Sequence, residues 1–301
     1  MQSGTINLSQ LDGGFDLQST LESGQTYCWE RLDGEMFEDD NLRGSEARYA
    51  TVVPASRTDS GNPEIITVRQ TDGYLDWEST TDADPHLREF LRLGDDLDEI
   101  VRQSPDLDVF KEAYDRFRGM RIVNDPVFPC LVSFICSAQM RVERIQLMQE
   151  NLRREFGTPV ELEGDTFYAF PTPEQLAEAS EEELRDCGLG YRAPYVKSTA
   201  EMVVDGLSPS KAAEMEYYDA RNHLKQFMGV GDKVADCVLL FSLGFLNAVP
   251  LDTWIRTTID DYFPECKADG YDEMSRNIRD RFGGQYAGYV QTYIFFHLRT
   301  R

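Results

Sequence analysis

The hydrophobic pattern of this chain changes its period once, near Pro85. Before that point, short runs rich in β-branched and aromatic residues are separated by turn signals such as Asp72-Gly73, a pattern typical of an antiparallel sheet. After it, apolar residues recur at helical spacing almost to the C-terminus. The chain is therefore predicted to be an α+β protein. The strands are expected at residues 47–53, 64–70 and 74–77.

With 301 residues, of which 41% are hydrophobic, the chain can bury a substantial core divided into two or three units. We predict an N-terminal β domain at residues 1–84 and a helical body at residues 85–301. Within the body, residues 85–119 together with 226–301 are expected to form one subdomain and residues 120–225 the other. The predicted helices span residues 86–94, 96–103, 107–117, 126–155, 173–180, 181–187, 192–205, 211–228, 232–243, 251–262, 271–281 and 284–299.

The charge is strongly acidic, with 54 acidic residues against 30 basic ones and a formal net charge of -24. Taken alone, this charge argues against a polyanionic partner, because phosphate contacts require local positive charge. The acidic residues are spread along the whole chain, however, and lysine is scarce. Such a surface is typical of a protein that works in concentrated salt, where exposed charges are screened within a few ångströms. We therefore expect a halophilic source, and affinity that depends on hydrogen bonds and burial.

The six cysteines contain no CxxC pair, so the sequence suggests neither a zinc site nor a thioredoxin motif. Buried free thiols are the default in a reducing compartment. The N-terminus lacks the basic and apolar regions of a signal peptide, and no apolar run approaches 18 residues. A cytoplasmic protein with no membrane partner is expected.

A tight turn separates two of the predicted helices at Gly229-Val230-Gly231. Two glycines keep Cβ atoms away from the turn, so a phosphate can approach backbone N–H groups at the next helix N-terminus, where Asp232 is the expected N-cap. Binding of this kind needs no net positive charge, which answers the objection from the acidic composition. The alternative, an ordinary tight turn between helices, is favoured for the glycines alone.

Two ionisable residues follow this turn. Lys233 opens an apolar helix in a chain with only six lysines, which makes it a candidate nucleophile: a lysine amine can attack an electrophilic carbon and form a Schiff base. Asp252 lies nineteen residues further on, at a predicted helix start. It can cap that helix, and it can also face the lysine as a carboxylate that stabilises positive charge or moves a proton.

Residues 227–237, followed by Ala248-Val249-Pro250-Leu251-Asp252, resemble the helix-hairpin-helix-Gly-Pro-Asp signature of DNA glycosylases, in the form of the 8-oxoguanine DNA glycosylase branch. Together with four further motifs, the resemblance covers nearly the whole chain. The motifs similar to that branch are SGQTYCW at 23–29, CLVSFICS at 130–137, GLGYRA at 188–193 and YAGYVQ at 286–291.

The resemblance implies a base-excision repair enzyme that acts on double-stranded DNA containing 8-oxoguanine opposite cytosine. The damaged nucleotide is rotated out of the duplex, Lys233 attacks C1′ to release the base, and the resulting Schiff base allows the strand to be nicked. Asp252 assists the lysine. A monofunctional glycosylase for alkylated or deaminated purines is one alternative, but it has no need of the hairpin lysine. A non-catalytic DNA-binding module is another, and the presence of both Lys233 and Asp252 argues against it.

The resemblance also implies a lesion pocket lined by Gly24, Cys237, Gln291 and Phe295. The Gly24 carbonyl is expected to accept the hydrogen bond that only the N7–H of the oxidised base donates. Cys237 and Phe295 are expected to sandwich the base, and Gln291 to contact its Watson–Crick edge. Taken singly, each residue also fits an ordinary role in a core, a turn or a helix surface.

On the side of the opposite base, the resemblance implies Tyr191 as a wedge that fills the gap and Arg192 and Arg144 as readers of the orphaned cytosine. The family often has a run of asparagines after the CLVSFICS motif, where this chain has Gln139-Met140-Arg141. Gln139 is the expected substitute, which puts strict recognition of cytosine in doubt.

Two other departures concern single positions. Trp254 stands where the animal enzymes have a histidine near the 5′ phosphate, so that contact is lost or replaced by packing. Met228 replaces the usual hairpin proline, a small loss of rigidity.

No cofactor is expected. The iron–sulfur cluster of some related glycosylases needs four closely spaced cysteines, and only Cys266 follows Asp252. The family makes a monovalent cation plausible at the carbonyls of Lys225, Phe227 and Val230. The protein is further expected to be a monomer, associated with the nucleoid of a halophilic archaeon.

Overall fold

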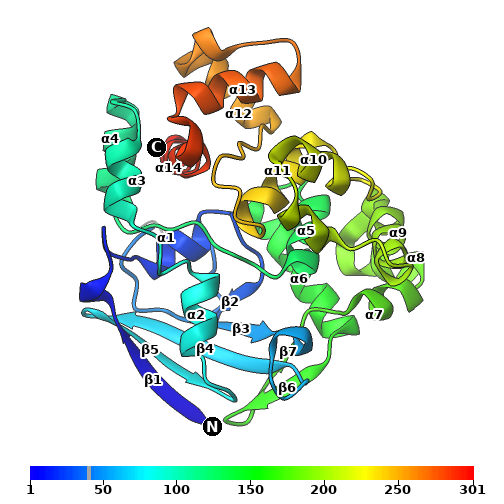
Figure 1. The fold of residues 1–301 in the computed structure, drawn as a ribbon. Helices are drawn as coiled ribbons and strands as arrows, with labels where there is room; N and C mark the ends of the chain where they lie inside the picture. The colour runs from blue at the N-terminus through cyan, green and yellow to red at the C-terminus, as the bar shows by residue number, and fades with distance from the viewer. Residues whose placement is uncertain (39–41) are drawn as a thin grey trace.

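The computed structural model describes residues 1–38 and 42–301. An antiparallel five-stranded sheet, in the order β1-β5-β4-β3-β2, lies beneath a helical body (Figure 1). This confirms the predicted α+β class, and the three predicted strands are present to within two residues. Strands β1 and β2, which carry few apolar residues, were not predicted. The strands are β1 (Gln2–Asn7), β2 (Trp29–Arg31), β3 (Arg48–Val53), β4 (Glu64–Thr71) and β5 (Tyr74–Ser79).

Helices and a hairpin cover the two faces of this sheet. On one face, α1 (Leu17–Glu22) and α2 (Asp84–Phe90) share an apolar cluster with the strands. On the other, the hairpin of β6 (Pro159–Leu162) and β7 (Asp165–Tyr168) packs Leu162 against the sheet. This hairpin interrupts the helical body and was not predicted. Because a body segment packs on each face, the sheet is fixed against the helices.

The helical body has one large apolar core that runs from Leu97 to Phe296. In Figure 1, α3, α4 and α12 to α14 lie together on one side of the body and α5 to α11 on the other. Its helices are α3 (Leu97–Gln103), α4 (Asp108–Arg116), α5 (Val127–Cys136), α6 (Val142–Phe156), α7 (Pro173–Glu178), α8 (Glu181–Leu184), α9 (Ala193–Val204), α10 (Tyr217–Leu224), α11 (Asp232–Phe241), α12 (Thr253–Tyr262), α13 (Tyr271–Arg281) and α14 (Ala287–Arg299).

Two predicted helices run through a turn, and the helix predicted at residues 86–94 ends early, at Phe90. Residues 126–155 form two helices, because the chain breaks after Cys136 and Gln139 adopts a φ of 54°, a left-handed conformation that ends a helix. Residues 211–228 form a short 3-10 segment and then α10, which ends at Leu224. In both places, apolar periodicity continues through a turn that the backbone makes, so the pattern overstates the helix.

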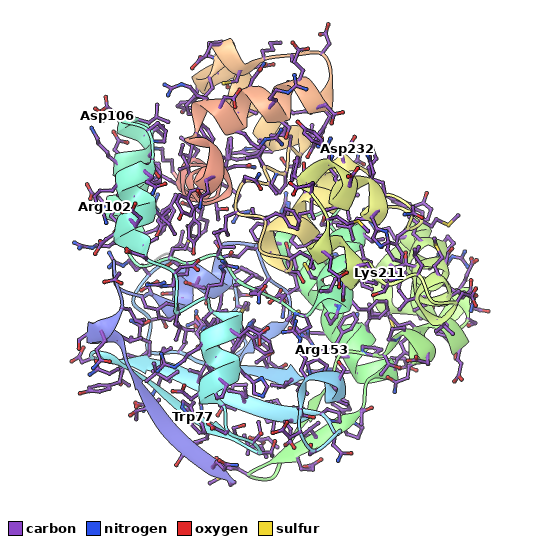
Figure 2. All side chains as sticks on the ribbon, in the orientation of Figure 1. Trp77, Arg102, Asp106, Arg153, Lys211 and Asp232 are labelled. Carbon is purple, nitrogen blue, oxygen red and sulfur yellow. The ribbon has the colours of Figure 1, made fainter. Side chains whose placement is uncertain are left out.

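Buried polar side chains fix the loop at residues 23–29 between the sheet and the body. Arg153 of α6 donates from Nη1 to the Tyr27 carbonyl at 2.8 Å, at the junction shown in Figure 2. Gln25 donates from Nε2 to the carbonyls of Thr20 at 2.8 Å and Arg121 at 2.7 Å. The backbone around Gly24 is therefore held from both sides.

Candidate active site

Helix α11 presents Lys233 at the edge of the core. The helix is amphipathic only in its first turn, since every residue from Val234 to Phe241 is buried while Lys233 is half-buried. Its Nζ donates to Ser137 Oγ at 2.7 Å and lies 5.3 Å from the centre of the Phe134 ring. The predicted nucleophile is thus held over the end of α5, which covers one side of its amine.

Asp252 caps α12, as expected: its Oδ1 accepts the Ile255 N–H at 2.7 Å. The side chain is nevertheless exposed. A carboxylate has lone pairs to spare after one cap hydrogen bond, so the capping and catalytic roles predicted for Asp252 are compatible. The cap also fixes the carboxylate, because its position is set by the first turn of the helix.

The thiol of Cys237 links the two catalytic candidates. Burial raises its pKa to about 12, the neighbouring Lys233 ammonium lowers it, and the carboxylates of Asp236 and Asp252 raise it. Both Lys233 and Asp252 therefore lie close enough to Cys237 to act on it electrostatically. The high pKa keeps Cys237 a neutral thiol at neutral pH, suited to packing against a base and unsuited to nucleophilic attack.

The other predicted pocket residues come from the two ends of the chain. Gly24 has a φ of +87°, and a Cβ there would lie 3.0 Å from Val142 Cγ1, so glycine is required twice over. On α14, Gln291 donates from Nε2 to the Pro250 carbonyl at 2.5 Å, and Phe295 is buried. The ring of Trp254 packs edge-on against Phe295 at 5.7 Å and is 40% exposed. At the position where the sequence departs from the expected histidine, Trp254 thus packs against a predicted pocket residue.

Two residues of this site escaped the sequence analysis. Ser137 ends the CLVSFICS motif and receives the Lys233 hydrogen bond; its place in a matched motif was the available signal. Arg299 donates from Nη2 to the Ser23 carbonyl at 2.7 Å, beside Gly24. Burial lowers the pKa of Arg299, while the nearby carboxylates of Asp252 and Glu143 raise it. No local pattern distinguishes Arg299 from a surface arginine.

The residues assigned to the opposite base gather at the break between α5 and α6. Tyr191 is 58% exposed, and the Arg192 guanidinium lies 4.3 Å from the centre of its ring. Arg192 is 3% exposed and donates from Nη2 to the Ala138 carbonyl. Gln139, with its positive φ, and Arg144, in the first turn of α6, are exposed. Tyr191, Arg192 and Gln139 are thus brought together from segments about fifty residues apart in sequence.

The glycine turn between α10 and α11 is as tight as predicted. Gly229 has a φ of +82°, and a Cβ there would lie 3.0 Å from the Tyr195 side chain, whereas a Cβ at Gly231 would meet open space. Between them, Val230 is buried. Open space in front of Gly231, at the N-terminus of α11, is what a bound phosphate requires.

The prediction for Asp232 is wrong. Gly231 is the N-cap of α11, and Asp232 is the first helical residue. Its Oδ1 pairs with Lys225 Nζ at 2.5 Å instead of capping the helix. The nearby ammonium competes with the backbone N–H groups for the carboxylate, and a charged donor gives the stronger hydrogen bond.

Within residues 1–38 and 42–301, no group of three or more His, Cys, Asp or Glu side chains is arranged to hold a metal ion. Over the same residues, the helices are all too short or too polar to cross a membrane. All six cysteines are free thiols.

Family models match both parts of the chain. Residues 132–283 match the HhH-GPD superfamily of base excision DNA repair proteins. Residues 5–131 match the N-terminal domain of 8-oxoguanine DNA glycosylase. A probable N-glycosylase/DNA lyase of Methanothermobacter thermautotrophicus is 32% identical over 95% of this chain and 94% of its own length. The N-glycosylase/DNA lyase of Saccharomyces cerevisiae is 30% identical over 85% of this chain and 70% of its own length.

Solved structures resemble the whole fold. The structure of MBOgg1 in complex with a low affinity DNA ligand is 28% identical, with a TM-score of 0.84 over 99% of this chain and 96% of that one. An 8-oxoguanine glycosylase/lyase of Clostridium acetobutylicum, in complex with double-stranded DNA containing cytosine opposite 8-oxoG, is 26% identical. Its TM-score is 0.80 over 95% of this chain and 92% of that one.

Proposed function

This chain belongs to the HhH-GPD superfamily of base excision DNA repair proteins, and we propose that it removes 8-oxoguanine from duplex DNA as a bifunctional N-glycosylase and AP lyase. The observation that carries this proposal is the position of Lys233. Lys233 stands at the start of α11, and its amine donates to Ser137 Oγ. Cys237 lies beside it, and the charges of both Lys233 and Asp252 act on the Cys237 thiol. A glycosylase that uses only water needs no such amine.

In the proposed reaction, Lys233 Nζ, once deprotonated, attacks C1′ of the flipped nucleotide. The new N–C1′ bond replaces the C1′–N9 bond, whose electron pair leaves with the base and is neutralised by a proton. Asp252 stabilises the positive charge that develops on the sugar. Opening of the sugar ring gives the Schiff base, and loss of a C2′ proton then expels the 3′ phosphate and nicks the strand.

Recognition of the lesion is proposed for Gly24, Cys237, Gln291 and Phe295. Among the described residues, the Oε1 atom of Gln291 is buried without a hydrogen-bond partner, a costly state unless a ligand supplies a donor. The Watson–Crick edge of 8-oxoguanine offers such donors. The other three residues would supply the carbonyl for N7–H and the two faces of the pocket.

Recognition of the opposite strand is proposed for Tyr191, Arg192, Gln139 and Arg144. The Nε of Arg192 is a second buried atom without a partner among the described residues, and a guanidinium fork suits the acceptors of an orphaned cytosine. The exposed ring of Tyr191 can stack in the gap left by the flipped base.

The glycine turn at residues 229–231 is proposed to bind a DNA phosphate through backbone N–H groups. A monovalent cation would fit at the carbonyls of Lys225, Phe227 and Val230, because hard cations take oxygen ligands. Among the described residues, the Phe227 carbonyl accepts one backbone hydrogen bond, from Val230 N–H at 3.2 Å. We further propose a monomer that works without an organic cofactor or iron–sulfur cluster. We also propose a cytoplasmic protein associated with the nucleoid; the six free thiols support the reducing setting alone.

The test is borohydride trapping on duplexes that carry 8-oxoguanine opposite each of the four bases, in high potassium chloride. The wild type is expected to form a covalent adduct, most with cytosine, and Lys233→Gln is expected to form none while still binding the duplex. Excision by this variant should fall by a factor on the order of 10³ or more. Lys267→Gln, an exposed lysine paired with Asp260, is the control. An adduct from Lys233→Gln equal to that of the wild type would refute the lysine mechanism.

A further inference from the structure

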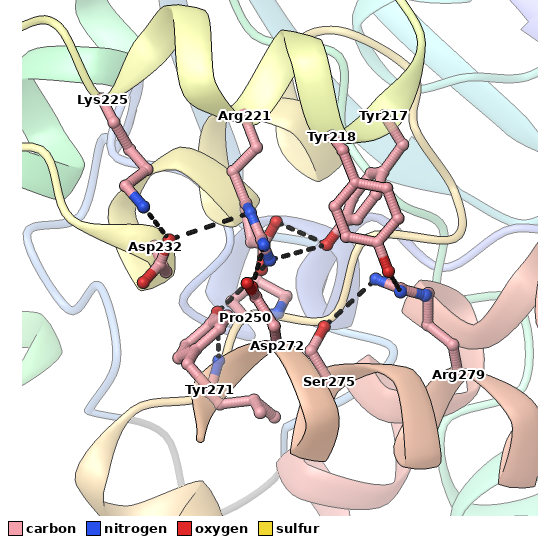
Figure 3. A network of polar contacts seen from close by, with 12 residues as sticks. Tyr217, Tyr218, Arg221, Lys225, Asp232, Pro250, Tyr271, Asp272, Ser275 and Arg279 are labelled. Atoms are coloured by element: carbon pink, nitrogen blue, oxygen red, sulfur yellow. Dashed lines mark hydrogen bonds and ion pairs between the residues drawn. The ribbon is translucent and has the colours of Figure 1, made fainter.

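Three residues after the nucleophile, α11 carries a carboxylate that the proposed chemistry does not use. Asp236 is 0% exposed, and its carboxylate is bonded to side chains of α10 and α13. Its Oδ1 accepts the Tyr217 hydroxyl at 2.8 Å, and its Oδ2 accepts the Tyr271 hydroxyl at 2.7 Å (Figure 3). The Arg221 guanidinium lies 3.6 Å from Oδ2. A buried carboxylate with this many partners is costly to assemble, so its geometry invites explanation.

The two tyrosines hold different parts of the molecule. Tyr217 belongs to α10, so its bond to Asp236 joins the two helices of the hairpin. Tyr271 begins α13, and its hydroxyl also accepts the Leu251 N–H at 3.1 Å (Figure 3). That amide immediately precedes Asp252. Through one hydroxyl, therefore, the helix that carries Lys233 is connected to the loop that carries Asp252.

We propose that Asp236 and Tyr271 are positioning residues that set the distance between Lys233 and Asp252. We call the chain of bonds from Asp236 through the Tyr271 hydroxyl to the Leu251 N–H the Asp236–Tyr271 bridge. The proposal rests on the proposed function, because it concerns the same reaction. Neither residue touches DNA in it; each acts through the backbone that it holds.

The surroundings support a rigid bridge. Arg221 of α10 also pairs with Asp272 of α13 and lies 3.8 Å from Asp232 Oδ1 at the start of α11. Its charge therefore links α10, α11 and α13. Burial raises the pKa of Asp236 to about 6, whereas the Tyr271 hydroxyl and Arg221 lower it. At neutral pH the carboxylate is ionised and accepts from both tyrosines, so the bridge is intact where the enzyme works.

The bridge matters for catalysis because it holds the residue next to Asp252, whereas the other cross-link of this loop, from Gln291 Nε2 to the Pro250 carbonyl at 2.5 Å, lies two residues away. The Asp252 carboxylate is exposed and bonded to its own helix, and the Leu251 amide is the adjacent attachment to another element. A shift of about 1 Å in a group that acts on the reacting centre costs up to a hundredfold in rate. Loss of the bridge should therefore lower the rate of chemistry without weakening DNA binding.

The chain offers a matched pair of variants for the test. Tyr271→Phe and Tyr217→Phe each remove one hydroxyl from Asp236, and only the first also releases the Leu251 amide. We expect Tyr271→Phe to lower the single-turnover excision rate about tenfold, with duplex Kd unchanged. Tyr217→Phe should lower that rate less than twofold. The fall in Tm should be similar in the two variants. Equal rates in the two variants, or a fall in rate explained by weaker binding, would overturn the proposal.

Amide hydrogen exchange at Leu251 gives a readout that needs no activity. Its N–H should be protected in the wild type and in Tyr217→Phe, and should exchange at least tenfold faster in Tyr271→Phe. Unchanged protection in Tyr271→Phe would show that the bridge does not hold this loop. If the wild type forms no borohydride adduct, the proposed function fails, and exchange at Leu251 alone then decides whether the bridge exists.

Discussion

The two sides of the candidate site differ in how firmly their side chains are held. On the lesion side, Cys237, Gln291 and Phe295 are buried, and the Gly24 backbone is fixed by its neighbours. On the opposite-base side, Tyr191 and Gln139 are exposed at chain turns, although Arg192 beside them is buried. A pocket that must distinguish bases by single hydrogen bonds gains from being preformed, because misplaced donors and acceptors give no discrimination. A wedge must enter a duplex, so it has to stand clear of its own protein.

The largest effect that would sharpen this contrast is expected on the stability of the protein, through a buried residue that packs against the loop at residues 23–29 on the lesion side. Asp125 is buried beside Thr26 and Cys28 of the 23–29 loop, and burial raises its pKa to about 7. Because the folded state holds the proton more tightly than the unfolded one, this contribution to stability is full below about pH 4 and is lost as the pH rises through 7. As the pH rises, the free energy of unfolding of Asp125→Asn should therefore increase relative to that of the wild type, by roughly 2–4 kcal/mol at pH 8.

Urea unfolding of both proteins between pH 5 and pH 8, at one fixed salt concentration, measures this difference. Asp125→Asn removes the titration while keeping the shape of the side chain, and Asp82→Asn, at an exposed surface position, is the control. Parallel stability curves for wild type and Asp125→Asn across this range would show that Asp125 does not titrate there.

A smaller effect is expected at Gln291, the proposed polar reader of the lesion. Gln291→Ala should lower single-turnover excision of 8-oxoguanine by about ten- to fiftyfold, since a bond between a buried amide and the base is worth about 1–3 kcal/mol. Affinity for an abasic duplex should change little. Thr292→Ala, next to it on α14 and bonded only within that helix, should leave the rate unchanged. A loss confined to abasic-duplex affinity would place Gln291 outside the pocket.

A weaker effect is expected on the opposite-base side. Tyr191→Ala should raise the duplex Kd about fivefold, the lower end of what one lost stacking contact costs, and Tyr191→Phe should behave as the wild type. Fluorescence anisotropy with a labelled duplex gives both values. Tyr74→Ala, an exposed tyrosine on the sheet, controls for surface changes. If Tyr191→Ala impaired excision as much as Gln291→Ala does, the contrast between a buried and an exposed side would be broken.

Salt concentration should affect the lesion side and the opposite-base side alike, so it distinguishes the two sides least. With a net charge of -24, the protein repels itself in dilute buffer, and added salt screens that repulsion within about 3 Å at 1 M. We expect Tm to rise and excision to persist as potassium chloride approaches about 2 M, well past the range in which screening of exposed charges saturates. Full stability and activity only in dilute buffer would contradict the halophilic interpretation.

Local signals in the sequence were sufficient for much of the site. The glycine turn, the position of Lys233 in the first turn of a helix and the cap at Asp252 were predicted and are present. Each depends on residues within four positions of one another. The same reasoning failed at Asp232, because a lysine seven residues away in sequence competes for its carboxylate, and it failed after Cys136, where apolar periodicity continues through a break.

The sequence by itself determined the fold class, the helix that carries Lys233 and the kinds of side chain available to the proposed pocket. Only the tertiary structure decided which distant groups meet them. Ser137 reaches Lys233 from 96 residues away, Arg299 reaches Ser23 from 276, and Tyr271 reaches Asp236 from 35. Caps and turns are encoded by neighbouring residues because they satisfy neighbouring backbone groups. Contacts between elements depend on how whole helices pack, which no short window of sequence records.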